Sequence, residues 1–341
     1  MNAKKILVTG GAGYIGAHTA VELIQSGYEV VIVDNLSRSD RTLLEGIEKI
    51  THKPVVFHEG DCCDKKFMMR LFRTTGPFSS VLHFAAFKSV GESVDQPLLY
   101  YDNNLNSLIT LLEVMVENGV ADLIFSSSCT VYGQPDVIPV NENAPFKRAE
   151  SAYGSTKQMC ERILEDVAPK GFRIMSLRYF NPIGAHPSIL IGEIPLGVPN
   201  NLVPYITQTG AGIREKLTVF GNDYNTPDGF CVRDFIHVVD LGTAHVMAMQ
   251  YLSGISEKKL YEVLNLGTGV GISVLQLIEK FIEVTGIKVP YTIGPRRPGD
   301  IEKVFADPTK VNNLLGWKTK FSIEDSLQHA WQWEKKIRGL K

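Results

Sequence analysis

The sequence predicts an α/β protein with a doubly wound, mostly parallel sheet and a smaller mixed α/β domain. Short apolar runs rich in β-branched residues alternate with helical patterns through the first half of the chain. These runs are apolar at consecutive positions, which is typical of parallel strands that helices cover on both faces. The length of 341 residues exceeds what one hydrophobic core commonly supports, and it predicts about two domains.

The first domain is predicted over residues 1–180. Helices are indicated at 19–26 and 104–118, where apolar residues recur with a helical period. Strands are expected at 5–9, 29–33, 54–58, 80–84, 123–126 and 174–177. A strand that alternates with a helix in this way predicts crossover connections within one parallel sheet.

The second domain is predicted over residues 181–341, because prolines and glycines crowd 181–204 and the later patterns are shorter. Two segments near 235–266 are expected to return to the first domain: a turn and helix at 235–251 and a strand at 261–266. Ser273 with Gln276 predicts a capping box before a helix over 274–284. The pair at 307–308 predicts the start of another short helix, which ends near Gly316.

Composition argues against several classes of protein. The net charge is −2 and no basic or acidic block is present, so we expect neither a nucleic-acid partner nor a membrane surface. No apolar stretch approaches the roughly 18 residues that a membrane helix needs, and the N-terminal apolar run is too short for a signal peptide. The five cysteines show no C-x-x-C spacing, so we expect neither disulfides nor zinc, and a cytoplasmic location.

Gly11, Gly13 and Gly16 form a G-x-G-x-x-G pattern between the first predicted strand and the first predicted helix. This context is typical of dinucleotide binding in a Rossmann domain, although a plain glycine turn would give the same pattern. The glycines let the backbone approach a pyrophosphate, and the amides at the helix start stabilise its negative charge.

Asp34 favours the dinucleotide interpretation. It ends the second strand about 20 residues beyond the central glycine, where a carboxylate accepts the ribose hydroxyls of adenosine. The same carboxylate would repel a 2′-phosphate, which favours NAD over NADP. Because Arg38 is close by and positively charged, NADP remains an alternative. Asp61 ends the third strand and is expected either to contact adenine or to form an ordinary turn.

Tyr153 and Lys157 stand four residues apart in a helical pattern, so their side chains share one face. The pKa of tyrosine is ordinarily about 10, and a nearby ammonium with a positive nicotinamide would favour the phenolate. Ser128 is placed to share the same proton. The pattern also fits an exposed helix pair, but the dinucleotide signal and the serine run at 126–128 favour proton transfer.

With these motifs the sequence resembles the extended short-chain dehydrogenase/reductase family and, within it, the UDP-glucose 4-epimerases. The resemblance covers nearly the whole chain. It rests on segments 8–16, 83–86, 126–133, 178–182, 199–202, 220–224, 232–234 and 296–300. The later segments are more specific than the glycine loop.

The resemblance implies a reversible reaction on a UDP-hexose. Tyr153 would take the proton of the 4-hydroxyl while C4 delivers hydride to tightly held NAD. The 4-keto sugar would then rotate, and hydride would return to its opposite face. The family also implies a homodimer formed through helices near 100–118 and 152–167.

The site residues follow from the same resemblance. Arg233 and Arg297 would clamp the diphosphate, and Asp300 would accept the uridine ribose hydroxyls. The alternatives are a surface ion pair at 233–234 and a solvated loop at 296–297. Implied cofactor contacts are Gly10, Gly13, Tyr14, Ile15, Gly16, Asp34, Asn35, Asp61, Cys62, Phe84, Ala85, Ala86, Lys88, Asn103, Ser126, Tyr153, Lys157, Tyr179 and Phe180. Implied substrate contacts are Ser128, Tyr153, Asn181, Asn200, Asn201, Leu202, Val219, Phe220, Arg233, Phe235, Arg297, Asp300 and Val304.

Four departures from the family pattern stand out. Phe235 replaces a common tyrosine, Cys129 replaces a common alanine, and the loop at 193–196 is less acidic and polar than in relatives. Val304 stands where members restricted to plain hexoses tend to carry a bulky tyrosine. We therefore hypothesise room for a 2-acetamido group, so that UDP-GlcNAc and UDP-GalNAc are also interconverted.

Three other functions were possible from the sequence: a dehydratase, another epimerase and a non-catalytic regulator. A 4,6-dehydratase would need an Asp-Glu pair where this chain has Cys129 and Thr130. Another nucleotide-sugar epimerase stays open, and so does a non-catalytic NAD-binding regulator, although a regulator would be expected to lose the Tyr–Lys pair. No metal site is expected, because His237, Asp240 and His245 fit helix capping and packing better.

Overall fold

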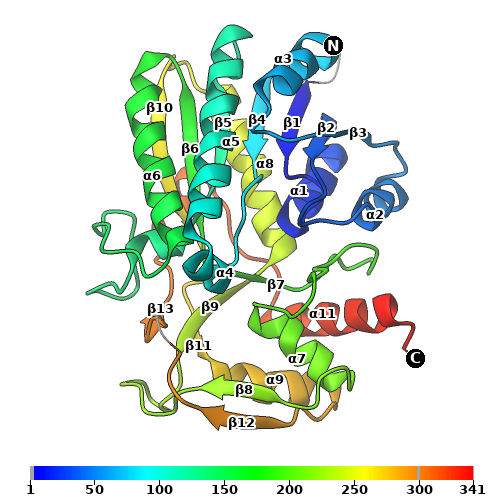
Figure 1. Cartoon of the computed structure of the whole chain (residues 1–341), viewed down its shortest axis with the longest axis vertical. Helices are drawn as coiled ribbons and strands as arrows, with labels where there is room; N and C mark the ends of the chain where they lie inside the picture. The colour runs from blue at the N-terminus through cyan, green and yellow to red at the C-terminus, as the bar shows by residue number, and fades with distance from the viewer. Residues whose placement is uncertain (1–3, 298–299, 341) are drawn as a thin grey trace.

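A computed structural model describes residues 4–297 and 300–340 of the chain. It has a seven-stranded sheet with helices on both faces. A smaller part lies below the carboxyl ends of the strands in the view of Figure 1. The strand order is β10-β6-β5-β4-β1-β2-β3, and every neighbouring pair is parallel. These strands are β1 Lys5–Thr9, β2 Glu29–Asp34, β3 Val56–Glu59, β4 Ser80–His83, β5 Asp122–Ser128, β6 Arg173–Tyr179 and β10 Leu260–Leu266. The doubly wound parallel sheet is thus confirmed.

Side chains on the central strands alternate between two buried layers, which explains the continuous apolar runs. Ile6 and Val8 of β1 face one hydrophobic cluster, whereas Leu7 faces the other. The first cluster is covered by α1 Tyr14–Gln25, α2 Thr42–Thr51, α8 Val238–Gly254 and α10 Thr309–Leu315. The second is covered by α3 Lys65–Thr75, α5 Pro97–Glu117 and α6 Ala152–Val167. The short helix α4 Val90–Asp95 precedes α5.

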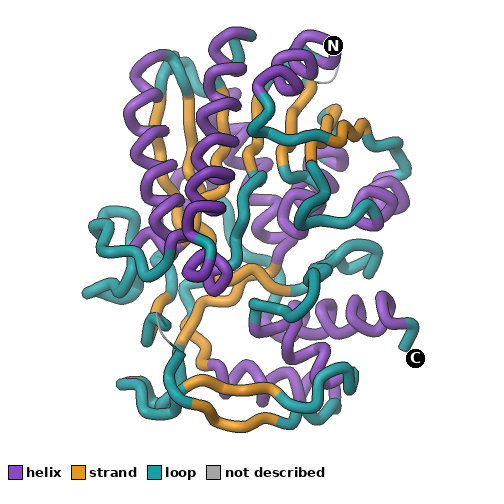
Figure 2. Tube along the Cα trace, viewed as in Figure 1, coloured by secondary structure: helices purple, strands orange, loops and turns teal. Residues whose placement is uncertain are grey.

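The smaller part lies below the main sheet in the view of Figure 2 and is built around strand β9. Strand β9 (Val232–His237) pairs with β7 (Asn181–Ile183) and β13 (Lys303–Val304) in parallel and with β11 (Gly271–Ser273) in antiparallel orientation. A two-stranded sheet of β8 Leu217–Phe220 and β12 Tyr291–Gly294 lies beyond it. A third hydrophobic cluster joins α7 Leu202–Gly210, α9 Val274–Thr285 and α11 Ile323–Arg338.

Several local predictions are confirmed and one is wrong. The capping box of Ser273 and Gln276 begins α9, and α10 ends at Gly316 in the left-handed conformation. Strand β10 does return to the main sheet as its edge strand, and α8 packs on the same sheet. The turn expected before α8 is instead the end of strand β9, because β7 and β11 offer it backbone partners there.

Asp234 joins the two parts of the molecule. Its carboxylate is fully buried and accepts hydrogen bonds from the amides of Thr268 (2.8 Å), Gly269 (3.0 Å) and Ala306 (3.1 Å). The hydroxyl of Thr268 donates a fourth, at 2.7 Å. Thr268 and Gly269 follow edge strand β10 of the main sheet, so one side chain fixes that edge to β9.

Replacing Asp234 with Ala should therefore destabilise the protein strongly. Each buried donor left without a partner costs about 1–3 kcal/mol, so we expect the free energy of unfolding to fall by at least about 3 kcal/mol. Urea denaturation followed by circular dichroism measures this. The control is Asp223→Ala, which removes only an exposed pair with Arg296 and should leave the midpoint nearly unchanged. Equal midpoints for the two variants would contradict the role of Asp234.

Candidate active site

A cavity of about 1330 Å³ lies between the carboxyl edge of the main sheet and the smaller part. Its lining comes from the loops that follow β1, β2, β3, β4, β5 and β6, and from the smaller part. Open parallel sheets bind ligands at this edge, and a volume of this size exceeds the roughly 300–1,000 Å³ of a typical ligand pocket. The cavity therefore has room for a dinucleotide and a second ligand.

The glycine loop brings the backbone close to the cavity. Gly10 has φ +68°, and a Cβ there would lie 2.6 Å from the amide nitrogen of Ala85. Helix α1 begins at Tyr14, and among the described residues no side chain caps its N-terminus at Gly13. The first-turn amides and the helix dipole are thus directed at the cavity, as a pyrophosphate requires.

Asp34 holds the loop that follows β2. One carboxylate oxygen accepts from the amide of Ala12 at 3.1 Å, and the other accepts from Leu36 (2.9 Å) and from the hydroxyl of Ser39 (2.7 Å). Asp61 lies nearby, where it accepts from the side chain of Asn35 at 3.2 Å and from the amide of Cys63. Asp34 and Asp61 both line the cavity, so this end suits an adenosine.

The predicted catalytic pair lies on α6, which Ser151 caps. The Nζ atom of Lys157 donates to the carbonyl oxygen of Ser126 at 2.6 Å and lies 5.8 Å from the ring centroid of Tyr153. Burial lowers the pKa of Lys157 to about 8 and raises the pKa of Tyr153 to about 12, although a hydrogen bond with Ser128 opposes the latter shift. We expected the ammonium of Lys157, together with a positive nicotinamide, to favour the phenolate. Within the chain alone, burial raises the pKa of Tyr153 instead.

The opposite wall of the cavity carries the predicted nucleotide-sugar contacts. Arg233 on β9 lies 3.8 Å from the carboxylate of Asp300. Its neighbour Asp234 is buried with backbone partners, so the alternative of a surface ion pair at 233–234 is wrong. Val304 is 2% exposed and pairs with Arg233 across β13 and β9. Residues 298–299 of the sequence motif lie outside the described residues.

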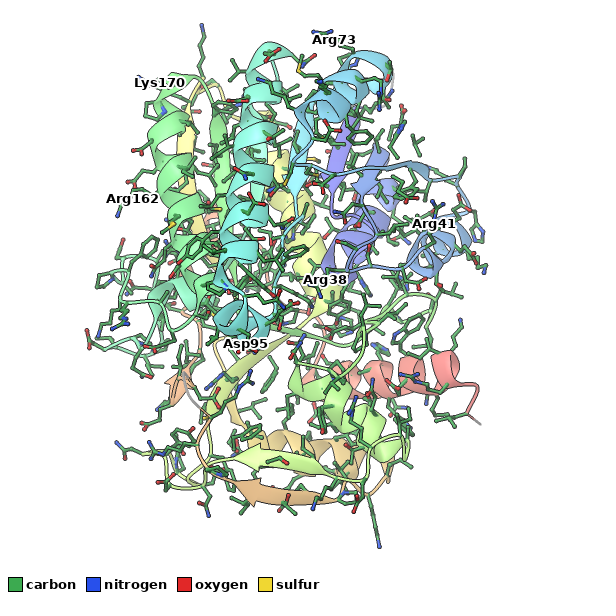
Figure 3. The ribbon with its side chains drawn as sticks, viewed as in Figure 1. Arg38, Arg41, Arg73, Asp95, Arg162 and Lys170 are labelled. Atoms are coloured by element: carbon green, nitrogen blue, oxygen red, sulfur yellow. The ribbon has the colours of Figure 1, made fainter. Side chains whose placement is uncertain are left out.

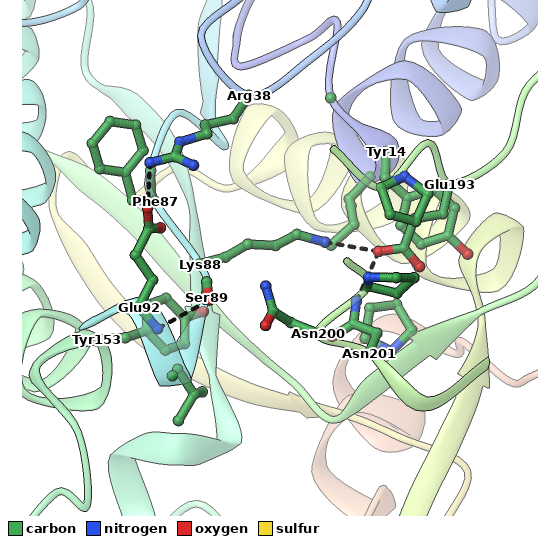
Figure 4. A pocket seen from close by; sticks show the side chains of 18 of the residues that line it. Tyr14, Arg38, Phe87, Lys88, Ser89, Glu92, Tyr153, Glu193, Asn200 and Asn201 are labelled. Carbon is green, nitrogen blue, oxygen red and sulfur yellow. Dashed lines mark hydrogen bonds and ion pairs between the residues drawn. The ribbon is translucent and has the colours of Figure 1, made fainter. Parts of the chain in front are cut away.

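Glu193 connects the two walls (Figure 4). Its carboxylate lies 3.1 Å from the Nζ atom of Lys88, in the segment after β4, and accepts from the side chain of Asn201 at 2.7 Å. Its backbone carbonyl accepts from the indole of Trp333 at 2.8 Å. Asn201 immediately precedes α7 of the smaller part. The carboxylate of Glu193 therefore links a lining residue of the main sheet, Lys88, to a lining residue of the smaller part.

Comparison with known proteins supports one family. A family model described as GDP-mannose 4,6 dehydratase matches residues 7–330. A UDP-glucose 4-epimerase of Bacillus subtilis is 48% identical over 339 residues, which is 98% of each chain. One of Dictyostelium discoideum is 48% identical over 332 residues, 97% of this chain and 95% of that one. The chain belongs to the UDP-glucose 4-epimerase family.

Solved structures of the same family superpose closely. The UDP-glucose 4-epimerase of Stenotrophomonas maltophila, with bound NAD and formylated UDP-arabinopyranose, matches with a TM-score of 0.95 at 48% identity, covering 98% of this chain and 99% of that one. The Bifidobacterium longum enzyme, in complex with NAD+ and UDP, matches with a TM-score of 0.94 at 45% identity, with the same coverage.

The cavity brings together nearly all of the residues predicted from the epimerase resemblance. Only Ser128 and Phe180 do not belong to its lining. Ser128 is buried, and its side chain counters part of the rise in the pKa of Tyr153. Phe180 is 4% exposed and belongs to the small hydrophobic cluster that includes Val304, so the cofactor contact expected of it stays a prediction.

Several lining residues in the segment that follows β4 were not predicted from the sequence. Phe87, Ser89 and Glu92 line the cavity together with Arg38. The available signal was the Ser-x-x-Glu pattern at 89–92, which is typical of a capped helix start, and Ser89 does cap α4. That pattern predicts the helix but not its contact with the loop after β2.

The histidines that had suggested a metal have structural partners. His237 caps α8 by accepting from the amide of Val239, and Asp240 accepts from the amides of Lys320 and Phe321. His245 contacts the carbonyl of Leu241 at 2.7 Å. Within residues 4–297 and 300–340, no group of three or more His, Cys, Asp or Glu side chains is arranged to hold a metal ion. No helix in these ranges is long and apolar enough to cross a membrane.

Proposed function

We propose that the chain interconverts UDP-glucose and UDP-galactose by reversible oxidation at C4, with NAD as its resident cofactor. The observation that carries this proposal is that the uncapped start of α1, the pair Tyr153 and Lys157, and Arg233 with Asp300 all face one cavity. The UDP-glucose 4-epimerases that resemble this chain over nearly their whole length support the same reaction.

The cofactor end of the cavity fits NAD. The amides at the start of α1 would bind the pyrophosphate, and Asp34 would accept the adenosine ribose hydroxyls. When bound, NAD would supply the acceptor for the hydride that leaves C4 of the sugar, and the positive charge of its nicotinamide. The remaining cofactor contacts are proposed at the other residues predicted from the sequence, and they include Phe180 at the back of the wall.

Tyr153 is proposed to move the proton of the sugar 4-hydroxyl. The side chain of Ser128 counters part of the rise in the pKa of this phenol and would hold the substrate oxygen in reach. The pKa of about 12 keeps the phenol protonated, as donation to the returning 4-oxygen requires. Lys157, fixed at Ser126, would stabilise the phenolate in the other half of the reaction.

Substrate binding is proposed to fix the UDP and leave the sugar free to rotate. Arg233 and Arg297 would pair with the diphosphate, and Asp300 would bind the uridine ribose. The sugar must turn each of its two faces toward the cofactor in the course of the reaction, so it needs few directional contacts of its own. The other proposed contacts along this wall are Asn181, Asn200, Asn201, Leu202, Val219, Phe220 and Phe235.

We propose that residues 1–180 form the domain that binds the cofactor and residues 181–341 the domain that binds the UDP-sugar, with α8 and β10 returning to the first.

The five cysteines are free thiols, which is consistent with a cytoplasmic location.

Replacing Tyr153 with Phe tests the reaction. Loss of the proton-transfer group should slow turnover of UDP-galactose by roughly 100- to 10,000-fold while UDP still binds. Product chromatography measures turnover, and calorimetry measures UDP affinity. Tyr251→Phe, on α8 and not part of the cavity lining, is the matched control. Retention of full activity by the Tyr153 variant would exclude this mechanism.

Val304 tests the range of substrates. Its small side chain is buried in the cavity wall, where a tyrosine would extend a ring into the space of a 2-acetamido group. We expect the wild-type chain to convert UDP-GalNAc as well as UDP-galactose. Val304→Tyr should lower the rate with UDP-GalNAc, relative to the rate with UDP-galactose, by about tenfold or more. Val304→Ala should preserve this ratio. An unchanged ratio in the tyrosine variant would refute the acetamido hypothesis.

A homodimer is proposed through α5 and α6, which pack side by side in front of the sheet (Figure 1). Their outer faces expose Leu98 (80%), Ile109 (40%), Val116 (65%) and Met159 (45%), more apolar surface than a solvated helix pair needs. Sedimentation velocity should show a dimer, and Ile109→Glu should shift it toward monomer. Ile293→Glu, an exposed apolar position on β12, should not. A monomeric wild-type chain would contradict this assembly.

A further inference from the structure

Arg38 lies in the loop after β2 and reaches across the cofactor end of the cavity. Its guanidinium Nη2 lies 2.6 Å from the carboxylate of Glu92 on α4, and its carbon lies 4.9 Å from the ring centroid of Phe87 (Figure 4). Figure 3 places Arg38 at the end of the main sheet that faces the smaller part, close to the end of α4 at Asp95. Arg38 is thus held between a carboxylate and an aromatic ring.

Glu92 is itself fixed by buried groups. Its second oxygen accepts from the hydroxyl of Tyr100 at 2.7 Å, and the residue Tyr100 is fully buried. The same tyrosine oxygen accepts from the amide of Ser89, whose hydroxyl caps α4 through the amide of Glu92. The hydrogen bond from Tyr100 and the charge of Arg38 lower the pKa of Glu92 and keep it ionised at neutral pH.

The other arginine of this loop is also paired. Arg41 forms an ion pair with Glu59, the last residue of β3. An arginine close to the residue that accepts the ribose hydroxyls is the group that binds the 2′-phosphate of NADP. This chain has two arginines within seven residues of Asp34, and each has a carboxylate partner.

We propose that Glu92 is a determinant of cofactor choice, because it holds Arg38 and neutralises the charge that a 2′-phosphate would need. The discrimination against NADP then has two sources. Asp34 repels the phosphate directly, and Glu92 withholds the cation that would compensate. An isolated exposed ion pair is weak, but this one is aligned by Phe87 on one side and Tyr100 on the other.

The test is Glu92→Gln, which keeps the size of the side chain and an acceptor for Tyr100 but removes the charge. Full-length protein carrying NAD is incubated with increasing NADP, and the bound nucleotides are measured by chromatography. The fraction exchanged gives the ratio of the two dissociation constants. We expect NADP affinity relative to NAD to rise about tenfold, the effect of one charge-assisted hydrogen bond.

Two further variants separate charge from local structure. Arg38→Gln combined with Glu92→Gln should return the ratio to that of the wild type, since no arginine is released. Tyr100→Phe should raise the ratio by less than Glu92→Gln does, because Arg38 keeps its carboxylate partner while that partner loses one of its hydrogen bonds. An unchanged ratio in Glu92→Gln, or the same rise in the double variant, would overturn the inference. The inference rests on the proposed use of NAD, and a wild-type chain that binds neither nucleotide would contradict that proposal instead.

Discussion

The buried carboxylate of Asp234 is the constraint on which the geometry of the site depends. It accepts three backbone amides and one hydroxyl from the segments after β10 and β13, so β9 cannot move independently of the main sheet. Burial raises the pKa of Asp234, and the four hydrogen bonds counter that effect. The adjacent Arg233 faces the cavity because its neighbour in the strand faces the interior. One strand therefore supplies both the joint between the parts and a wall of the site.

A second buried network lies at the end of β5. In the serine run there, the carbonyl of Ser126 accepts from Lys157, and the side chain of Ser128 counters part of the rise in the pKa of Tyr153. Ser127 points to the other face, where it donates to Glu161, and Glu161 forms a buried ion pair with Arg178. Strand alternation thus directs the side chain of Ser127 to the core, away from the face to which the side chains of its two neighbours point.

The parts of the fold that the sequence predicted are those set by local patterns. Strand β1 was predicted at its observed bounds, and the glycine loop follows it, because periodicity and backbone geometry act over a few residues. The contacts that close the site join distant residues. Arg38 and Glu92 are 54 positions apart, and Lys88 and Glu193 are 105 apart. No local pattern encodes such pairs, and for the same reason the buried position of Phe180 was not foreseen.

The charges of the cavity are arranged differently at its two ends. At the cofactor end, Arg38 is tightly paired and aligned, so a pyrophosphate there depends on the amides and dipole of α1. At the other end, Arg233 lies 3.8 Å from Asp300, a separation that leaves the guanidinium able to bind a second anion. The diphosphate contacts proposed at this end therefore include a guanidinium whose charge is only partly engaged. The groups proposed to meet the cofactor pyrophosphate are instead backbone amides, whose positions helix α1 already fixes.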